Sequence, residues 1–143
     1  THEYWGPGGR LYFHRKTVPG WTPTSIASID RDGGDYRGHF ASDGRKLGHS
    51  CISADGRWIV SDVQDREGNE LYRVDLRNGS SEILCWPNST LQDGTVGHVH
   101  PSFNFAGDRV IYTSDKTGKA ARKGDAWYKR LIGRAVRIYR QYE

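Results

Sequence analysis

The alternation of apolar and polar residues is clearest between residues 49 and 87. Residues 70–76 (Glu-Leu-Tyr-Arg-Val-Asp-Leu) alternate as expected of a half-buried strand, and two tight-turn signals, Asp55-Gly56 and Asn78-Gly79, separate neighbouring apolar runs. The predicted strands are residues 50–53, 58–62, 70–76 and 82–86. Four antiparallel strands in about forty residues is the size of one β-propeller blade.

Two further segments repeat this pattern less regularly. The first has predicted strands at residues 10–15, 25–30 and 36–40, and the other has them at 100–105 and 108–114. We therefore predict an all-β chain of about three four-stranded antiparallel β-propeller blades in an incomplete ring. The predicted divisions are a blade at residues 1–48, a blade at 49–97, a partial blade at 98–125 and a C-terminal helix or tail at 126–143.

The C-terminal segment has a different period. Its apolar residues recur at steps of three and four, with basic residues between them: Trp127, Leu131, Ala135, Ile138 and Tyr142. This pattern predicts a basic amphipathic helix, which would cover an open sheet edge. Its charges are typical of a solvated helix face, and attachment to a membrane surface is a weaker alternative. A strand over residues 135–141 also remains open.

The composition agrees with many short strands joined by turns. Of the 143 residues 18 are Gly, 35% are apolar, and no apolar run is long enough to cross a membrane. The net charge of +4 mildly favours an anionic partner without requiring nucleic acid. Cys51 and Cys85 fall in apolar strands and are interpreted as reduced core residues. The chain begins at Thr1 and contains no Met, which indicates a processed product or part of a longer protein.

Three histidines occupy one repeated position. They lie roughly fifty residues apart, each seven residues before a turn glycine. The pairs are His2 with Gly9, His49 with Gly56, and His100 with Gly107. Imidazoles at equivalent positions of successive blades can converge on a shared axis, as a metal or proton-transfer site requires. We therefore expect the functional site there.

Two stretches resemble the repeat of TolB-type β-propellers, and three shorter motifs resemble the oligogalacturonate lyases more specifically. The TolB-like stretches are residues 53–62 and 101–115. The lyase-like motifs are His2-Glu-x-Trp5-x-Pro-x-Gly9, Gly48-His49 before a Ser-x-Asp-Gly turn, and His98-x-His100-Pro-Ser-Phe103. This resemblance covers residues 1 to about 119. It implies a seven-bladed propeller that splits short pectate oligomers by β-elimination with a manganese ion, in the cytoplasm.

The resemblance also implies roles for individual residues. His2 matches the general base of the family. The family's histidine metal ligands match His49, His98 and His100. The fourth ligand of the family, a glutamine, falls at Thr95 here, and Gln92 lies three residues further back, so these two are the possible substitute ligands. An arginine important to the family would lie before Thr1.

The residues themselves are compatible with such a metal site. His98 and His100 are two apart on a predicted strand, so both project from the same face, and the first strand of a blade lines the central channel. Three imidazoles and an oxygen ligand suit Zn, Mn, Fe or Ni, so only the resemblance favours Mn²⁺. Purely structural histidines are the alternative. His14 and His39 lie off the repeated position and are interpreted as ordinary residues.

The predicted function is that of a metal-dependent polysaccharide lyase acting on oligogalacturonides. The expected partner is an acidic oligosaccharide, with no nucleic acid and no membrane, and self-association would complete the propeller. We expect the isolated chain to have weak or no lyase activity unless copies associate. Two alternatives remain: a non-catalytic TolB-like interaction module, and a structural remnant whose histidines are vestigial.

Overall fold

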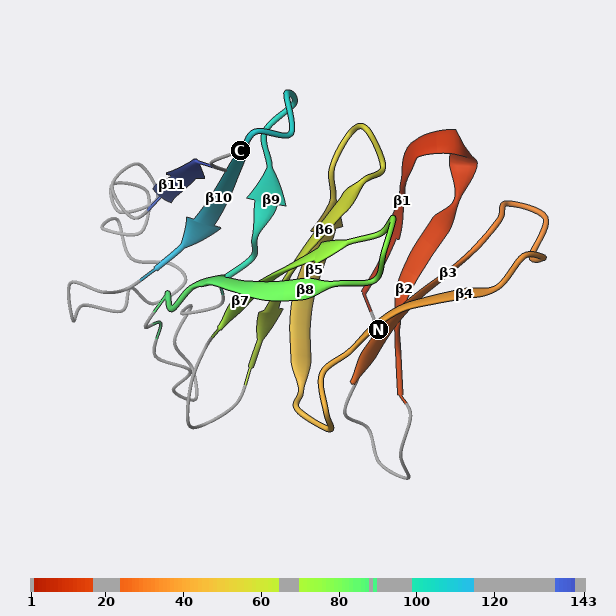
Figure 1. The fold of residues 1–143 in the computed structure, drawn as a ribbon, viewed down its shortest axis with the longest axis horizontal. Helices are drawn as coiled ribbons and strands as arrows, with labels where there is room; N and C mark the ends of the chain where they lie inside the picture. Colours follow the sequence, from red (N-terminus) through yellow and green to blue (C-terminus); the bar gives the residue numbers. More distant parts are fainter. Residues whose placement is uncertain are drawn as a thin grey trace, which may run out of the picture.

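The computed structural model describes residues 2–16, 24–64, 70–87, 89, 99–114 and the backbone of 136–140. The strands are β1 (Glu3–Trp5), β2 (Leu11–Arg15), β3 (Ser25–Ile29), β4 (Arg37–Ala41), β5 (Leu47–Ile52), β6 (Trp58–Val63), β7 (Leu71–Asp75), β8 (Ser81–Cys85), β9 (Ser102–Phe103), β10 (Arg109–Thr113) and β11 (Val136–Arg140). A short 3-10 turn, η1 (Pro7–Gly9), follows β1. These strands form three antiparallel sheets, β1–β4, β5–β8 and β9–β11 (Figure 1). The predicted all-β fold is confirmed, while the residue boundaries assigned to the blades stay a prediction.

The three repeated glycines have the same backbone conformation. The angle φ is 75° at Gly9, 73° at Gly56 and 74° at Gly107. This left-handed region is open to glycine without a steric penalty, which explains why glycine recurs there. Each glycine lies between the first and second strands of its sheet. The sequence repeat is therefore also a repeat of structure.

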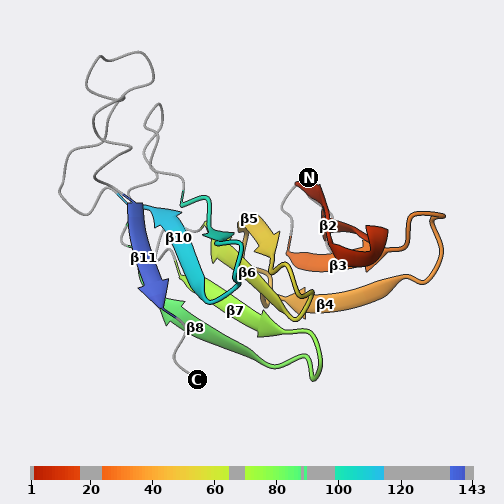
Figure 2. The ribbon, with the colours of Figure 1, turned by 90° about the horizontal axis from the view of Figure 1, so that it is seen from above.

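The first strands of the three sheets lie next to one another. Seen from above, the sheets stand side by side, with β5 on one side of the second sheet and β8 on the other (Figure 2). Strand β5 contacts β9 of the third sheet, and Ser50 on β5 donates a hydrogen bond to Tyr4 on β1. Residues on β1, β5 and β9 are thus brought close to one another.

Two apolar clusters fix the sheets against each other. The cluster between the first and second sheets contains Tyr12, Ile26, Leu47, Ile52, Ile59, Val63 and Val74. The cluster between the second and third sheets contains Val60, Leu71, Val99, Val110 and Tyr112. Full burial of one such side chain contributes about 1.5–3 kcal/mol. Cys51 and Cys85 pack against the second cluster and form no disulfide, as predicted for reduced core residues.

The predicted C-terminal helix is wrong for residues 136–140, which form strand β11. This strand pairs antiparallel with β10, with Val136 opposite Thr113 and Arg140 opposite Arg109. The pairing satisfies the backbone groups on one edge of β10, and a strand suits the β-branched and aromatic residues of this stretch. The rest of the predicted helix lies outside the described residues. In the described part of the chain, no helix is long and apolar enough to span a membrane.

Candidate functional site

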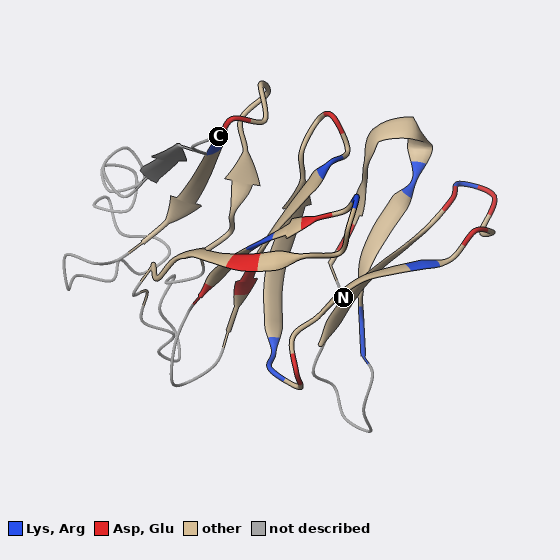
Figure 3. Cartoon of the chain, viewed as in Figure 1, with Lys and Arg blue, Asp and Glu red and all other residues tan. Residues whose placement is uncertain are grey.

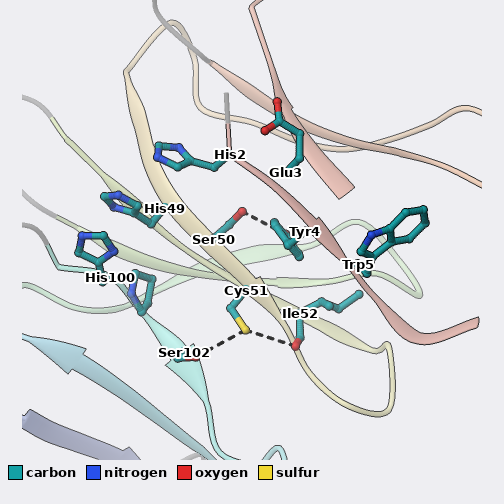
Figure 4. Close-up of a pocket in the computed structure, with 11 residues that line it drawn as sticks. His2, Glu3, Tyr4, Trp5, His49, Ser50, Cys51, Ile52, His100 and Ser102 are labelled. Atoms are coloured by element: carbon teal, nitrogen blue, oxygen red, sulfur yellow. Dashed lines mark hydrogen bonds between the residues drawn. The ribbon is translucent and has the colours of Figure 1, made fainter. Parts of the chain in front are cut away.

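A pocket of about 410 Å³ lies beside the first strands of the three sheets (Figure 4). It is lined by residues 2–5, 49–52 and 100–102. The side chains of His2, His49 and His100 lie in a row along it, one from the start of each sheet (Figure 4). His2 and His100 are exposed, and His49 is half-buried. The repeated position therefore does bring three imidazoles to one place, which we call the histidine pocket.

The imidazole rings are in direct contact. The ring centroids of His2 and His49 are 4.5 Å apart, and those of His49 and His100 are 3.6 Å apart and stacked at 29°. The other proposed ligands, His98, Gln92 and Thr95, lie outside the described residues. The roles assigned to all of these residues stay predictions.

Gly48 allows the backbone of His49 to approach two buried polar side chains. A Cβ atom at position 48 would overlap the carboxylate of Asp62 and the amide of Gln64, both on or next to β6. Because Gly48 has no Cβ atom, the His49 backbone N–H can donate to Asp62 Oδ1 at 2.5 Å. Gln64 Nε2 donates to Asp62 Oδ2 at 3.2 Å. The glycine before His49 is therefore required sterically, because any larger residue would overlap Asp62 and Gln64.

Asp62 and Gln64 also face the ring of His49. Its Nδ1 lies 3.6 Å from Asp62 Oδ1 and 3.3 Å from Gln64 Nε2. Asp62 is fully buried, with 0% of its surface exposed. Nδ1 accepts from the Gln64 amide in one tautomer; in the other it carries the ring proton, faces this carboxylate and leaves Nε2 with its lone pair. A carboxylate behind the far nitrogen of an imidazole is the usual support of a histidine metal ligand.

The backbone is strained where the third histidine joins the row. His100 has a φ of 43°, in the left-handed region that residues with a Cβ rarely adopt, and it precedes Pro101. The residue before a proline favours extended backbone, which adds to the strain. Such conformations persist only when the surrounding packing determines them, and they cluster at functional sites. Val99, fully buried next to it, provides that packing.

A fourth imidazole, His14 on β2, lies behind His2. Their ring centroids are 5.5 Å apart in an edge-on arrangement, and only 2% of His14 is exposed. His14 Nε2 lies 2.7 Å from Ser50 Oγ, which in turn donates to the hydroxyl of Tyr4 at 3.0 Å. His14 Nδ1 is buried without a hydrogen-bond partner in the described part of the chain. His14 therefore packs against the histidine pocket, and its interpretation as an ordinary residue stays a prediction.

The electrostatics of the site keep two of these rings neutral. Burial, together with nearby His2, lowers the pKa of His14 to about 4. Burial also lowers the pKa of His2, with a contribution from His49. Burial raises the pKa of Tyr4, so its hydroxyl stays protonated. At neutral pH, His2 is therefore an unprotonated imidazole that can accept a proton.

The donor set fits a transition metal only in part. Within the described residues, no three His, Cys, Asp or Glu side chains are arranged to hold a metal ion. Two of the three predicted histidine ligands are side by side, and one of them has a carboxylate behind it. Imidazole nitrogens of this kind suit Mn, Fe, Ni or Zn, and the third predicted ligand, His98, lies outside the described residues. The chemistry of the two described imidazoles is therefore compatible with such an ion.

Antiparallel sheets that stand side by side, with their first strands around one pocket, are blades of a β-propeller. TolB from Acinetobacter baumannii has the same fold, with a TM-score of 0.56 over 82% of this chain and 31% of its own, at 18% identity. That likeness concerns the fold alone.

The chain is more similar to oligogalacturonate lyases. An oligogalacturonide lyase from Pectobacterium atrosepticum is 28% identical over 144 residues, covering 85% of this chain and 35% of the relative. A solved oligogalacturonate lyase in complex with manganese superposes with a TM-score of 0.69 at 26% identity, covering 89% of this chain and 36% of that one. No family model matches the chain. The predicted resemblance is confirmed, and the chain spans about a third of the length of these relatives.

Proposed function

We propose that this chain is the histidine-bearing part of a metal-dependent lyase that cleaves oligogalacturonides by β-elimination. The observation that carries the proposal is the contact row of His2, His49 and His100, which lie on or just before the first strands of successive blades. The similarity to lyases, one of them described in complex with manganese, supports the same assignment. The carboxylate of Asp62 behind His49 adds the supporting group that a ligand imidazole needs.

In this proposal the metal ion is Mn²⁺, held by His49, His98 and His100. Gln92 or Thr95 would supply an oxygen ligand, or water would take that position. When bound, the ion acts as a Lewis acid on the uronate carboxylate and stabilises the negative charge that develops there. Stacking of His49 on His100 keeps their ring planes similarly oriented before any ligand arrives.

His2 is the proposed general base. It is exposed at the pocket, and its lowered pKa leaves it unprotonated at neutral pH. The C5 hydrogen of a uronate lies next to a carboxylate, so removal of this hydrogen gives an enediolate-like anion. His2 takes the C5 proton, the released electron pair forms the C4–C5 double bond, and the C4–O bond breaks. The leaving oxygen then takes a proton from water.

The partner in this proposal is an acidic oligosaccharide, and the location is cytoplasmic. The net charge of +4 assists the approach of a polyanion modestly, because salt screens it. Since the chain spans about a third of its relatives, we propose that turnover needs further blades, from the same polypeptide or from associated copies. Metal binding and turnover are therefore tested separately.

Equilibrium dialysis against Mn²⁺ tests the metal half of the proposal. The wild-type chain is expected to retain the ion, and the double variant His98→Ala/His100→Ala to lose it. His39→Ala is the control, because His39 lies outside the histidine pocket. Equal binding by the wild type and the double variant would contradict the proposal and favour a non-catalytic interaction module. Turnover is followed by the ultraviolet absorbance of the unsaturated uronate product.

A further inference from the structure

A second pocket, of about 440 Å³, lies across the seam between the first two sheets. It is lined by Arg10, Tyr12, Arg37, Gly38, His39, Gly56, Leu76 and Arg77. We call it the arginine pocket. Gly56 lies in the turn that follows β5, whereas His49 lies in the first half of that strand. The proposed lyase chemistry uses none of the residues that line it.

The arginines at this pocket outnumber the carboxylates that they pair with directly, and Asp30 and Asp55 add negative charge nearby. Arg10 and Arg37 share one carboxylate, Asp35, at 2.7 and 2.5 Å. Arg77 and Arg57 share another, Asp75, at 2.8 and 3.6 Å. Each pair of guanidinium groups therefore keeps one positive charge beyond its carboxylate. Figure 3 shows basic segments at the start of β2, on β4 and at the turn between β7 and β8.

Two guanidinium groups keep one nitrogen available. Arg37 uses Nε and Nη2 on Asp35, and Arg77 uses Nε and Nη2 on Asp75. The Nη1 group of each has no hydrogen-bond acceptor within the described residues. Arg37 comes from the first sheet and Arg77 follows β7 of the second, so the two arginines line the pocket from its two sides.

His39 adds a neutral donor between them. Arg10 Nε donates to Ser28 Oγ at 3.2 Å, so the hydroxyl hydrogen of this buried serine is left to donate to His39 Nε2 at 2.8 Å. His39 Nε2 then acts as the acceptor, and the ring proton is on Nδ1. Burial and the charges of Arg10 and Arg37 lower the pKa of His39, which agrees with a neutral ring. Its Nδ1–H is available to a ligand.

We propose that the arginine pocket binds a small oxyanion, namely a carboxylate or phosphate group, on the spare N–H donors of Arg37, Arg77 and His39. Guanidinium and imidazole N–H groups match the geometry of such anions and form strong charge-assisted hydrogen bonds with them. Gly38 leaves space for the ligand, because a Cβ atom at this position would meet nothing within 4 Å. The carboxylates of Asp30 and Asp55 are already engaged in their own turns, by the N–H groups of Gly34 and Arg57. The proposal does not depend on lyase activity.

An NMR titration of the full chain tests this site. Inorganic phosphate and galacturonate are added separately at an ionic strength of about 20 mM, where screening is weak. We expect the backbone signals of residues 37–39 and 76–77 to shift, and binding to be about tenfold weaker in Arg37→Gln and Arg77→Gln. Arg31→Gln is the matched control, because Arg31 pairs with Asp32 and does not line the pocket.

A second pair of variants separates loss of the site from loss of the fold. Gly38→Glu places a carboxylate in the open space and is expected to abolish binding, whereas Gly38→Gln has nearly the same size and should retain most of it. The site is supported if phosphate, galacturonate or both bind to the wild type and if binding weakens in the variants as expected. Which of the two anions binds identifies its source. Absence of binding to the wild type, or equal binding in Gly38→Glu and Gly38→Gln, would overturn the proposal. Mn²⁺ retention is expected to be unchanged in all of these variants.

Discussion

The histidine pocket and the arginine pocket hold their polar groups in opposite ways. The first contains imidazoles supported by buried partners, such as His14 at 2% exposure and Asp62 at 0%. The second contains permanent charges that remain in contact with water, with 58% of the Arg37 side chain and 61% of the Arg77 side chain exposed. Burial lowers the proton affinity of imidazoles at the first pocket. Water solvates the ionic groups of the second pocket, so keeping them charged there costs little free energy. The two pockets should therefore respond differently to pH and to substitution.

The largest expected difference between the two pockets is the pH dependence of the free energy of unfolding. The pKa of His14 is about 4 in the folded chain, below the 6.5 of an unperturbed histidine. Between these values the unfolded chain binds more protons, so stability falls as the pH decreases from about 6.5 to about 4. The loss attributable to His14 is about 3 kcal/mol. Urea unfolding followed across this range measures it, and His14→Gln should flatten the dependence.

The carboxylates of the arginine pocket should respond in a lower pH range. Hydrogen bonds from Arg37 and then Arg10 lower the pKa of Asp35, and hydrogen bonding by Arg77 lowers that of Asp75 to about 2. Their stabilisation is present above the ordinary carboxyl pKa near 4 and decreases below it. If the free energy of unfolding of the wild-type chain did not decline between pH 6.5 and 4, the predicted difference between the two pockets would be contradicted.

Steric substitution at two glycines should give the next largest difference. Gly48→Ala is expected to destabilise the chain by about 2–3 kcal/mol, because the added methyl group overlaps Asp62 and Gln64 beside His49. Gly38→Ala at the arginine pocket meets no atom within 4 Å and should change the free energy of unfolding by less than about 0.5 kcal/mol. Denaturant midpoints compare the two, and similar losses would show that Gly48 is not sterically required.

Removal of the carboxylate charge behind His49 should weaken the metal site. Asp62→Asn preserves the size of the side chain but replaces a charged acceptor with an amide. Mn²⁺ affinity is expected to fall about tenfold, the lower end of what loss of such a supporting group causes. Calorimetric titration with Mn²⁺ measures the effect, and Asp75→Asn provides the matched control at the other pocket. Unchanged affinity in Asp62→Asn would remove Asp62 from the proposed site.

The smallest effect is expected for ion pairs at the arginine pocket. Arg37→Gln removes a contact to Asp35 between exposed groups, and such pairs contribute little to folding. We expect a change in the free energy of unfolding of less than about 0.5 kcal/mol, even though oxyanion binding becomes about tenfold weaker. A loss of more than about 1 kcal/mol in thermal unfolding would mean that Arg37 mainly supports the fold.

Local patterns in the sequence predicted most of the described strands and the convergence of three histidines on one pocket. The alternation over residues 70–76 and the turn glycines are local signals, and strand β7 and Gly56 follow them. Strand β1 was missed because three residues are too few to show a period. The C-terminal helix was predicted from apolar steps of three and four, whereas the pairing of β11 with β10 depends on a distant strand.

The supporting groups of the site could not be predicted, because they come from other strands. Asp62 reaches His49 across the β5–β6 pair, and its only sequence signal is a carboxylate within an apolar run. His14 meets Ser50 across the seam between two sheets. The arginine pocket likewise joins Arg37 and Arg77, which lie far apart along the chain. Spacing along a sequence does not report such contacts.

The half-buried thiol of Cys51 offers a direct way to follow the occupancy of the histidine pocket. Its Sγ lines that pocket and lies 3.8 Å from Ser102 Oγ, at the junction of the second and third sheets (Figure 4). An alkylating reagent must enter the pocket to reach it, so a bound sugar or ion should slow the labelling. The rate of modification at Cys51 would then report occupancy in the native chain without an engineered labelling site.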